Sequence, residues 1–236
     1  MCDLLADTGI AGRPDSFFRR QSIPWWAEHF KVSVAEWGDQ HDFDHPYLAA
    51  ALRQGCGGTA VFGLRLMWES VADLSNRLQA FYPDLENDQR RFQSAFGSSV
   101  YVHLSRQDKV AQAVSRVKAQ QTGLWHVATD GTERERLKPG RAPVYDAQQL
   151  SEHVRALTDD DAAWTRWFAQ QKIQPLCITY EMLSRDPHTA LASVLSALDL
   201  DPSVATTVEP RTAKLADRQS RDWATRFRTE QQSPFA

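Results

Sequence analysis

The sequence predicts an α/β fold with a mainly parallel sheet. Short apolar runs typical of strands alternate along the chain with longer stretches in which apolar residues recur at helical spacing. The chain has 236 residues, of which 42% are hydrophobic, so it is long enough to bury a large core. We expect one domain over residues 1–236, and the sequence contains no internal repeat.

Composition excludes several classes of function. The formal net charge of −3 provides no basic field, so nucleic acid is not an expected partner. No apolar run approaches the roughly 20 residues of a membrane helix, and the N-terminus lacks a signal-peptide pattern, so we expect a cytoplasmic protein without a membrane partner. Cys2, Cys56 and Cys177 lack ligand spacing, so we expect neither a disulfide framework nor a metal site.

The first hundred residues carry mostly helical signals, with aromatic residues from Phe17 to Phe30 that suit core or interface packing. The expected elements are a helix end over 1–6 stopped by Gly9, a turn over 12–15 (GRPD), a helix over 47–52 closed by Gly55, a strand over 59–67, and a helix over 70–81 ended by Pro83.

A strand followed closely by a helix is the clearest signal in the middle of the chain. Residues 100–104 alternate apolar and polar side chains and follow a Gly-Ser turn, which predicts a buried strand that ends just before Arg106. The helix expected from Asp108 has an apolar stripe formed by Val110, Val114, Val117 and Leu124.

The remaining elements follow from the same patterns. We expect an exposed loop or short hairpin over 129–143, a helix over 146–171 with a break or cap at 159–161, a strand over 176–180, a helix opened by Asp186-Pro187, and a basic tail over 212–230.

The strand end at Arg106 predicts an anion site. Ligands of α/β proteins collect at the carboxyl ends of strands, where helix N-termini present N–H groups. Ser115 lies on one helix edge with Gln112 and Lys118, so its hydroxyl and the Arg106 guanidinium can donate to one phosphate. The alternative, a solvated loop arginine and an ordinary helix serine, stays open on this pattern alone.

Four ordered segments resemble the bacterial carbohydrate sulfotransferases typified by trehalose 2-sulfotransferase. These segments are TGIAGRPDSFF, LSRQDKVAQAVSRVKAQQTGLWH, ITYEMLSRDP and KLADRQSRDWATRFR. The resemblance covers nearly the whole chain. It implies a three-layer α/β sandwich of the P-loop nucleotide-binding, sulfotransferase type, and it implies 3′-phosphoadenosine-5′-phosphosulfate as the sulfuryl donor.

The resemblance assigns residues to the donor. Arg106 and Ser115 match the 3′-phosphate site, although the family spacing is typically eight residues and the eighth position here is Val114. Tyr180 matches a tyrosine near the adenine. The tail residues Lys214, Arg218 and Trp223 resemble a nucleotide-covering segment; the alternative is a solvated helix with one buried tryptophan.

The resemblance also assigns an acceptor side. The GRPDSFF segment matches one in which the trehalose enzymes carry a glutamate proposed as general base, and here Asp15 and Ser16 stand at the matching positions. A carboxylate suits this role because a sugar hydroxyl loses its proton as it attacks sulfur. Asp15 is also a routine turn residue. The acceptor, a carbohydrate or small alcohol, would be bound by Arg13, Ser16, Trp125 and His126.

In this family the first strand and a Gly- and Ser-rich loop for the 5′-phosphosulfate precede the position of Met1. We therefore expect the first strand to be missing here, through a start assigned too late, a fragment or a degenerate homologue. The implied reaction needs no metal. A P-loop kinase would require a GxxxxGK[ST] loop, which the chain lacks, and a non-catalytic nucleotide- or sugar-binding module remains the alternative. A homodimer is a further expectation.

Overall fold

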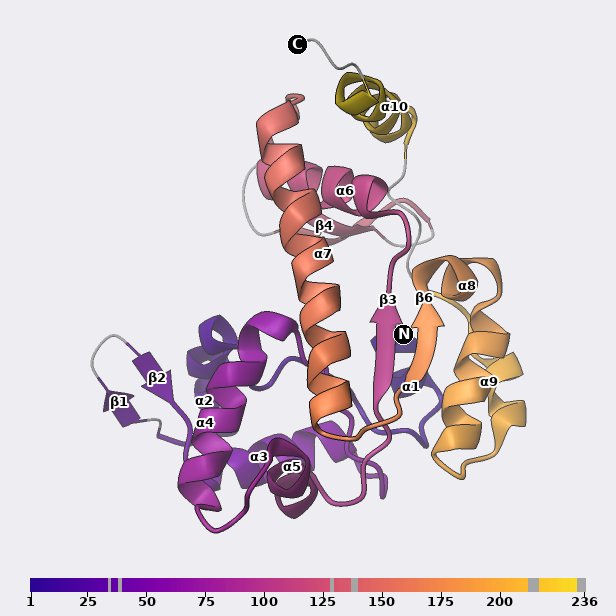
Figure 1. The fold of residues 1–236 in the computed structure, drawn as a ribbon. Coiled ribbons are helices and arrows are strands. Elements are labelled where there is room, and N and C mark those ends of the chain that lie inside the picture. Colours follow the sequence, from indigo (N-terminus) through magenta and orange to yellow (C-terminus); the bar gives the residue numbers. More distant parts are fainter. Residues whose placement is uncertain (34, 38–39, 128–129, 137–139, 212–216, 233–236) are drawn as a thin grey trace. The chain divides into compact units, whose positions relative to one another are not determined.

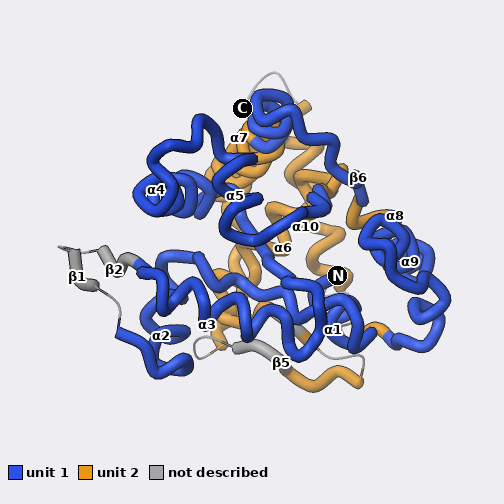
Figure 2. The backbone as a smooth tube through the Cα atoms, turned by 90° about the horizontal axis from the view of Figure 1, so that it is seen from below, with its two compact units in different colours: residues 1–103, 164–178, 182–209 blue, residues 104–163, 179–181, 210–236 orange. Residues whose placement is uncertain are grey.

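The computed structural model describes residues 1–33, 35–37, 40–127, 130–136, 140–211 and 217–232 (Figure 1). The chain divides into two compact units (Figure 2). Unit 1 comprises residues 1–103, 164–178 and 182–209, and unit 2 comprises residues 104–163, 179–181 and 210–236. The expectation of a single domain stays a prediction.

Unit 1 begins with a series of short helices. Its elements up to residue 96 are α1 (Cys2–Asp7), η1 (Arg20–Ser22), α2 (Ile23–Phe30), β1 (Ala35–Trp37), β2 (Gln40–Asp42), α3 (His45–Cys56), η2 (Trp68–Ser70), α4 (Val71–Phe81) and α5 (Asp88–Phe96). The strands β1 and β2 form an antiparallel pair. Unit 1 later receives the end of α7 (Ala147–Gln170), most of α8 (Tyr180–Arg185), α9 (Pro187–Ala197) and η3 (Pro202–Thr207).

Aromatic rings fill the main core of unit 1, as the sequence predicts for the stretch from Phe17 to Phe30. The buried Tyr47 hydroxyl donates to the Phe17 carbonyl oxygen at 2.5 Å, which ties α3 to the segment that follows the GRPD turn. The other buried rings of this core are Phe17, Phe18, Trp26, Phe43, Phe92, Trp167 and Phe168.

A small parallel sheet is formed by two strands that are far apart in the sequence. It pairs β3 (Val102–Ser105) with β6 (Leu176–Thr179), whose arrows point the same way in Figure 1. The Leu176 N–H donates to the Tyr101 carbonyl oxygen at 2.8 Å. Each strand is followed at its carboxyl end by a helix, β3 by α6 (Lys109–Thr122) and β6 by α8. The prediction of a buried strand is wrong in part, because Val100 and Leu104 are exposed.

Unit 2 packs three helices around one core. Its elements are α6, β4 (Leu124–Val127), β5 (Glu133–Arg136), residues 147–163 of α7, and α10 (Arg218–Gln232). The strands β4 and β5 form an irregular antiparallel hairpin. It begins before the loop or hairpin expected over 129–143, and the prediction that Leu124 continues the helix stripe is wrong, because α6 ends at Thr122 and is capped by Gly123. The buried core residues are Ala113, Val114, Val117, Leu150, Leu157, Trp223, Ala224 and Phe227.

The strand expected over 59–67 does not form. A single parallel bridge joins Leu64 to Asp15, and the Arg65 N–H donates to the Asp15 carbonyl oxygen at 3.0 Å. Pro14 precedes the bridge and has no N–H to donate, so a ladder cannot continue past it in that direction. The segment is held in an extended form by backbone contact with the GRPD turn.

Helix limits differ from the expectation in three places. The chain continues in helix α7 through 159–161, so the predicted break or cap is wrong; these residues lie inside a continuous helix, whose backbone N–H groups need no cap, and the Asp161 carboxylate pairs with Lys109. Helix α3 runs past Gly55 and ends at Gly57, which adopts the left-handed conformation. Helix α5 was not expected, because its apolar stripe is limited to Phe92, Ala95 and Phe96.

Within the described residues, no helix has the length and apolar character needed to cross a membrane.

Candidate functional site

A hollow of about 320 Å³ lies within unit 2 where α6 faces α10. We call it the α6–α10 pocket. Its lining combines three arginines with hydroxyl groups and one carboxylate, which suits an anionic ligand. The lining residues are Arg106, Asp108, Ala111, Ser115, Tyr180, Ser220, Arg221, Ala224, Thr225 and Arg228.

Arg106 is the most distinctive group of the α6–α10 pocket. It follows β3, and its guanidinium carbon lies 4.5 Å from the centre of the Tyr180 ring, in cation–π contact. Its Nε atom is buried and has no hydrogen-bond partner among the residues that the structure describes. A buried donor without a partner costs free energy, so an acceptor in the pocket would relieve it.

The beginning of α6 is already occupied by carboxylates. The backbone N–H groups of Gln107 and Asp108 donate to the Glu181 side chain at 3.2 and 3.4 Å, and the Ala111 N–H donates to the Asp108 side chain at 2.9 Å. The expectation that this helix start presents free N–H groups to an anion is therefore wrong for these three groups. Side chains, rather than the helix N-terminus, provide the donors of the pocket.

Arg228 of α10 reaches across to Asp108. One of its terminal nitrogens (Nη2) contacts both oxygens of the Asp108 carboxylate at 2.7 Å. Burial alone would raise the pKa of Asp108, but the hydrogen bonds from the Ala111 N–H and Arg228 and the charges of Arg228 and Arg106 lower it. Burial likewise opposes, without outweighing, the backbone hydrogen bonds and the Arg106 charge that lower the pKa of Glu181. Both carboxyl groups are therefore ionised near neutral pH.

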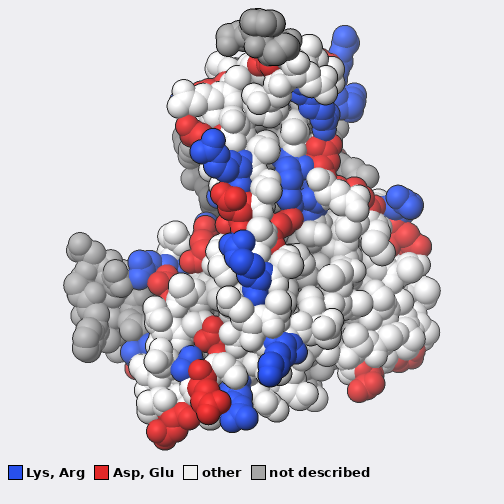
Figure 3. All heavy atoms as spheres, viewed as in Figure 1, with Lys and Arg blue, Asp and Glu red and all other residues white. Residues whose placement is uncertain are grey.

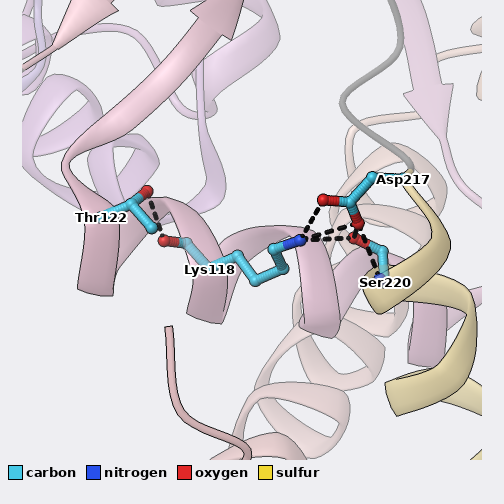
Figure 4. Close-up of polar contacts among 4 residues, drawn as sticks. All are labelled: Lys118, Thr122, Asp217 and Ser220. Atoms are coloured by element: carbon cyan, nitrogen blue, oxygen red, sulfur yellow. Dashed lines mark hydrogen bonds and ion pairs between the residues drawn. The ribbon is translucent and has the colours of Figure 1, made fainter. Parts of the chain in front are cut away.

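A second polar contact fixes α10 against α6. The Lys118 ammonium contacts both oxygens of Asp217 at 2.8 Å and the Ser220 hydroxyl at 3.0 Å (Figure 4). Asp217 also accepts the Ser220 N–H at 2.8 Å and so caps α10. Burial opposes these hydrogen bonds, yet Lys118 and Ser220 together lower the pKa of Asp217 to about 2.

The predicted donor residues divide into two groups. Arg106, Ser115 and Tyr180 come together in the α6–α10 pocket, and the structure places Val114, the alternative to Ser115, in the buried core. Trp223 is buried in the same core, and Arg218 is exposed beside Asp222 at 3.8 Å, so neither belongs to the pocket lining. Lys214 lies outside the described residues.

Several lining residues of α10 were not expected from the sequence. Arg221, Thr225 and Arg228 follow one another at helical spacing beside the buried face of Trp223 and Phe227. This spacing is the signal that identifies them, once the buried face of the helix is known. Asp108 and Glu181 were also missed, although an aspartate just before a helix is a capping signal.

The predicted acceptor segment, residues 12–16, belongs to unit 1; we call it the Asp15 turn. Asp15 is exposed, and its Oδ1 atom accepts the Ser16 N–H at 2.6 Å. Ser16 is only 4% exposed, and its hydroxyl accepts from Arg65 Nε at 2.7 Å. Ser16 therefore connects the turn to Arg65, a residue that the sequence did not single out.

Close backbone packing shapes the Asp15 turn. Gly12 has φ of +73°, and a Cβ there would lie 2.4 Å from the Val61 carbonyl oxygen. A Cβ on Gly63 would lie 2.6 Å from the Pro14 nitrogen. Only glycine fits at these positions, because any side chain would push the two segments apart.

The other predicted acceptor residues lie in different places. Arg13 is exposed, and the stem of its side chain lies over Gly57. Trp125 is half-buried in β4 of unit 2. His126 is in the same strand, and its side chain lies outside the described set. Among the described residues, no group of three His, Cys, Asp or Glu side chains is placed to hold a metal ion.

A family model and two related proteins all match this chain over nearly its whole length. The sequence pattern of the Stf0 sulphotransferases matches residues 1–230. The chain belongs to the Stf0 sulphotransferase family. A trehalose 2-sulfotransferase of Mycobacterium tuberculosis is 31% identical over 248 residues, covering 98% of this chain and 90% of the relative. A trehalose 2-sulfotransferase of Mycolicibacterium smegmatis is 28% identical over 250 residues, with the same two coverages.

Family membership identifies this chain as a sulfotransferase and confirms the predicted resemblance. The mixed α/β structure with its small parallel sheet agrees with that family. The comparisons lend no support to a non-catalytic binding module. On the face of the molecule drawn in Figure 3, basic and acidic side chains lie beside one another, so this face shows no large area of a single charge.

Proposed function

We propose that this Stf0 sulphotransferase transfers a sulfuryl group from 3′-phosphoadenosine-5′-phosphosulfate to a hydroxyl group of a carbohydrate or small alcohol. The observation that carries the proposal is the buried, unpartnered Nε of Arg106 in a pocket rich in arginine and hydroxyl groups. The same proposal includes a P-loop-type three-layer sandwich as the full fold.

The residues of the α6–α10 pocket fit the 3′-phosphate end of this donor. Arg106 and Ser115 provide N–H and O–H donors for phosphate oxygens, and the Tyr180 ring offers an aromatic surface near them. The Ser220 hydroxyl already donates to Asp217 at 2.7 Å. Asp108 is the one lining carboxylate, and Arg228 neutralises it. The lining thus contains three arginines and one carboxylate.

When bound, the donor supplies the sulfuryl group and departs as adenosine 3′,5′-bisphosphate. The Asp15 carboxylate is proposed to accept the proton of the acceptor hydroxyl, using Oδ2, because Oδ1 already holds the Ser16 N–H. Arg106 orients the nucleotide by binding its phosphate and contributes mainly through positioning. No step in this scheme calls for a metal ion.

The acceptor is a small molecule in this proposal. Both relatives carry the name trehalose 2-sulfotransferase, so trehalose is the first acceptor to test. In this proposal, the acceptor contacts Arg13, Trp125 and His126. The proposal also takes the protein to be a soluble cytoplasmic homodimer. The side chain of Asp15 is one methylene shorter than that of the glutamate at the matching position of the trehalose enzymes. This difference favours an acceptor held closer to the Asp15 turn.

Nucleotide binding tests the proposal directly. We expect adenosine 3′,5′-bisphosphate to bind in isothermal titration calorimetry with no comparable binding of ATP. Arg106→Ala should weaken this binding by about 1.5–3 kcal/mol, the range for a hydrogen bond to a charged group. Arg155→Ala, an exposed arginine of unit 2 outside the pocket lining, is the control and should leave the affinity unchanged.

Two results would contradict the proposal. Equal binding of ATP and the bisphosphate would remove the specificity for a 3′-phosphate. An unchanged affinity in a folded Arg106→Ala protein, checked by circular dichroism, would show that the phosphate binds elsewhere.

A further inference from the structure

The contact between Asp108 and Arg228 lies inside the α6–α10 pocket. Both residues belong to the lining, and Arg228 Nη2 is 2.7 Å from each oxygen of the Asp108 carboxylate. The two side chains are 45% and 43% exposed, so a ligand entering the pocket can reach them. An arginine in a phosphate pocket is thus engaged by a carboxylate of the protein itself.

A phosphate group and the Asp108 carboxylate would compete for the same N–H donors of Arg228. Guanidinium groups bind both anions through the same planar set of N–H groups. A phosphate monoester carries up to two negative charges and more acceptor oxygens than a carboxylate, so it is the stronger partner. A half-exposed ion pair contributes only about 0–1 kcal/mol, so the Asp108–Arg228 pair is weak enough to be exchanged.

Asp108 cannot leave the pocket when the exchange takes place. It precedes α6, and its carboxylate accepts the Ala111 N–H at 2.9 Å as the cap of that helix. Its negative charge therefore stays beside any bound phosphate. Asp108 acts against anion binding in two ways, because it holds Arg228 and because it repels the ligand.

We propose that Arg228 is a phosphate-binding residue of the α6–α10 pocket and that Asp108 competes with the phosphate for it, so that Asp108 lowers the affinity for the nucleotide. The inference rests on the proposed function, because it takes the nucleotide to be adenosine 3′,5′-bisphosphate and its sulfated form. A lower affinity for this product favours its release, which often limits the turnover of well-evolved enzymes.

The test uses substitutions that separate charge from structure. Asp108→Asn keeps the side-chain oxygen that caps α6, because asparagine is as good a cap as aspartate, and removes the competing charge. We expect it to tighten binding of adenosine 3′,5′-bisphosphate by about 3- to 5-fold in calorimetry, as for an exposed ion pair. Arg228→Met should weaken binding by about 10-fold, as for a charge-assisted hydrogen bond.

Two matched controls lie in the same unit. Asp222→Asn removes an equal charge from a 68%-exposed residue of α10, and Arg226→Met removes a cation paired with Glu230 at 2.7 Å. Neither residue lines the pocket, so both variants should bind the nucleotide as the parent does. In an Arg228→Met background, Asp108→Asn should lose the part of its effect that comes from competition for Arg228 and keep the part that comes from repulsion of the ligand, so the two substitutions should not be additive.

The outcomes distinguish this inference from the proposed function. If the parent protein binds the bisphosphate and Arg106→Ala weakens it, while Asp108→Asn changes nothing, the competition is wrong and the donor assignment stands. Weaker binding by Asp108→Asn would also overturn it, because Asp108 would then be a favourable ligand contact. No binding by the parent protein would overturn both proposals.

Discussion

The α6–α10 pocket and the Asp15 turn hold their functional side chains in different ways. At the pocket, side-chain charges fix the geometry: Arg228 binds Asp108 within the lining, and Lys118 binds Asp217 outside it, where the contact holds α10 against α6. In the turn, backbone packing fixes it, because Gly12 and Gly63 allow two chain segments to meet without side chains between them. A charged pocket adapts to a charged ligand, whereas a packed turn sets the position of one carboxylate.

The largest effect in this comparison of the pocket with the turn is expected at Asp15 itself. Asp15→Asn keeps the oxygen that accepts the Ser16 N–H but removes the base, so kcat for sulfuryl transfer should fall by about 100- to 10,000-fold. The measurement is turnover with trehalose and other sugar acceptors. Asp84→Asn, an exposed carboxylate elsewhere in unit 1, should turn over normally. An undiminished kcat in Asp15→Asn would exclude it as the base.

The packing of the turn is tested next, at Gly12. Gly12→Ala places a Cβ against two carbonyl oxygens at a positive φ, so the free energy of unfolding should fall by about 2–4 kcal/mol in urea titration. Gly9→Ala is the matched control, because Gly9 has φ of +69° but open space around its Cβ position. It should cost only about 1 kcal/mol. Equal losses in the two variants would show that backbone conformation, rather than close packing, sets the cost.

The smallest effect is expected at the Lys118–Asp217 contact. The folded-state pKa of Asp217, about 2, lies below its ordinary value of 3.8, so its contribution to stability is present above about pH 4 and is lost as the pH falls toward 2. Asp217→Asn keeps the cap on Ser220 but removes this charge. It should lower the free energy of unfolding at pH 7 by less than about 1 kcal/mol, because Asp217 is 57% exposed.

The pH dependence provides the check. The difference in unfolding free energy between the parent and Asp217→Asn should shrink as the pH is lowered from 5 to 2, measured by urea titration at each pH. Asp222→Asn, which removes a charge from a weaker contact of the same helix, should show no comparable change. A difference that grows on acidification would contradict the assignment of the low pKa to this contact.

Sequence periodicity was sufficient where one helix face is buried. Val114 and Val117 of α6 lie in the core of unit 2 with Val110 packed against it, and α9 begins at Pro187 with Asp186 as its cap, as predicted; Leu124, the last residue of the expected stripe, lies in β4 instead. Periodicity failed where a segment's structure depends on a distant one. Residues 59–67 have the composition of a strand, but the segment that pairs with them is the Asp15 turn, where Pro14 prevents a continuous β-ladder.

The candidate sites show the same division. Local order along the chain was enough to identify the family and the end of a strand just before Arg106. The tertiary structure was needed to show which face of α10 lines the pocket, and it placed Arg221 and Arg228 there and Trp223 in the core. It also paired Asp108 with Arg228, 120 residues away, because such contacts arise from helix packing that no local pattern encodes.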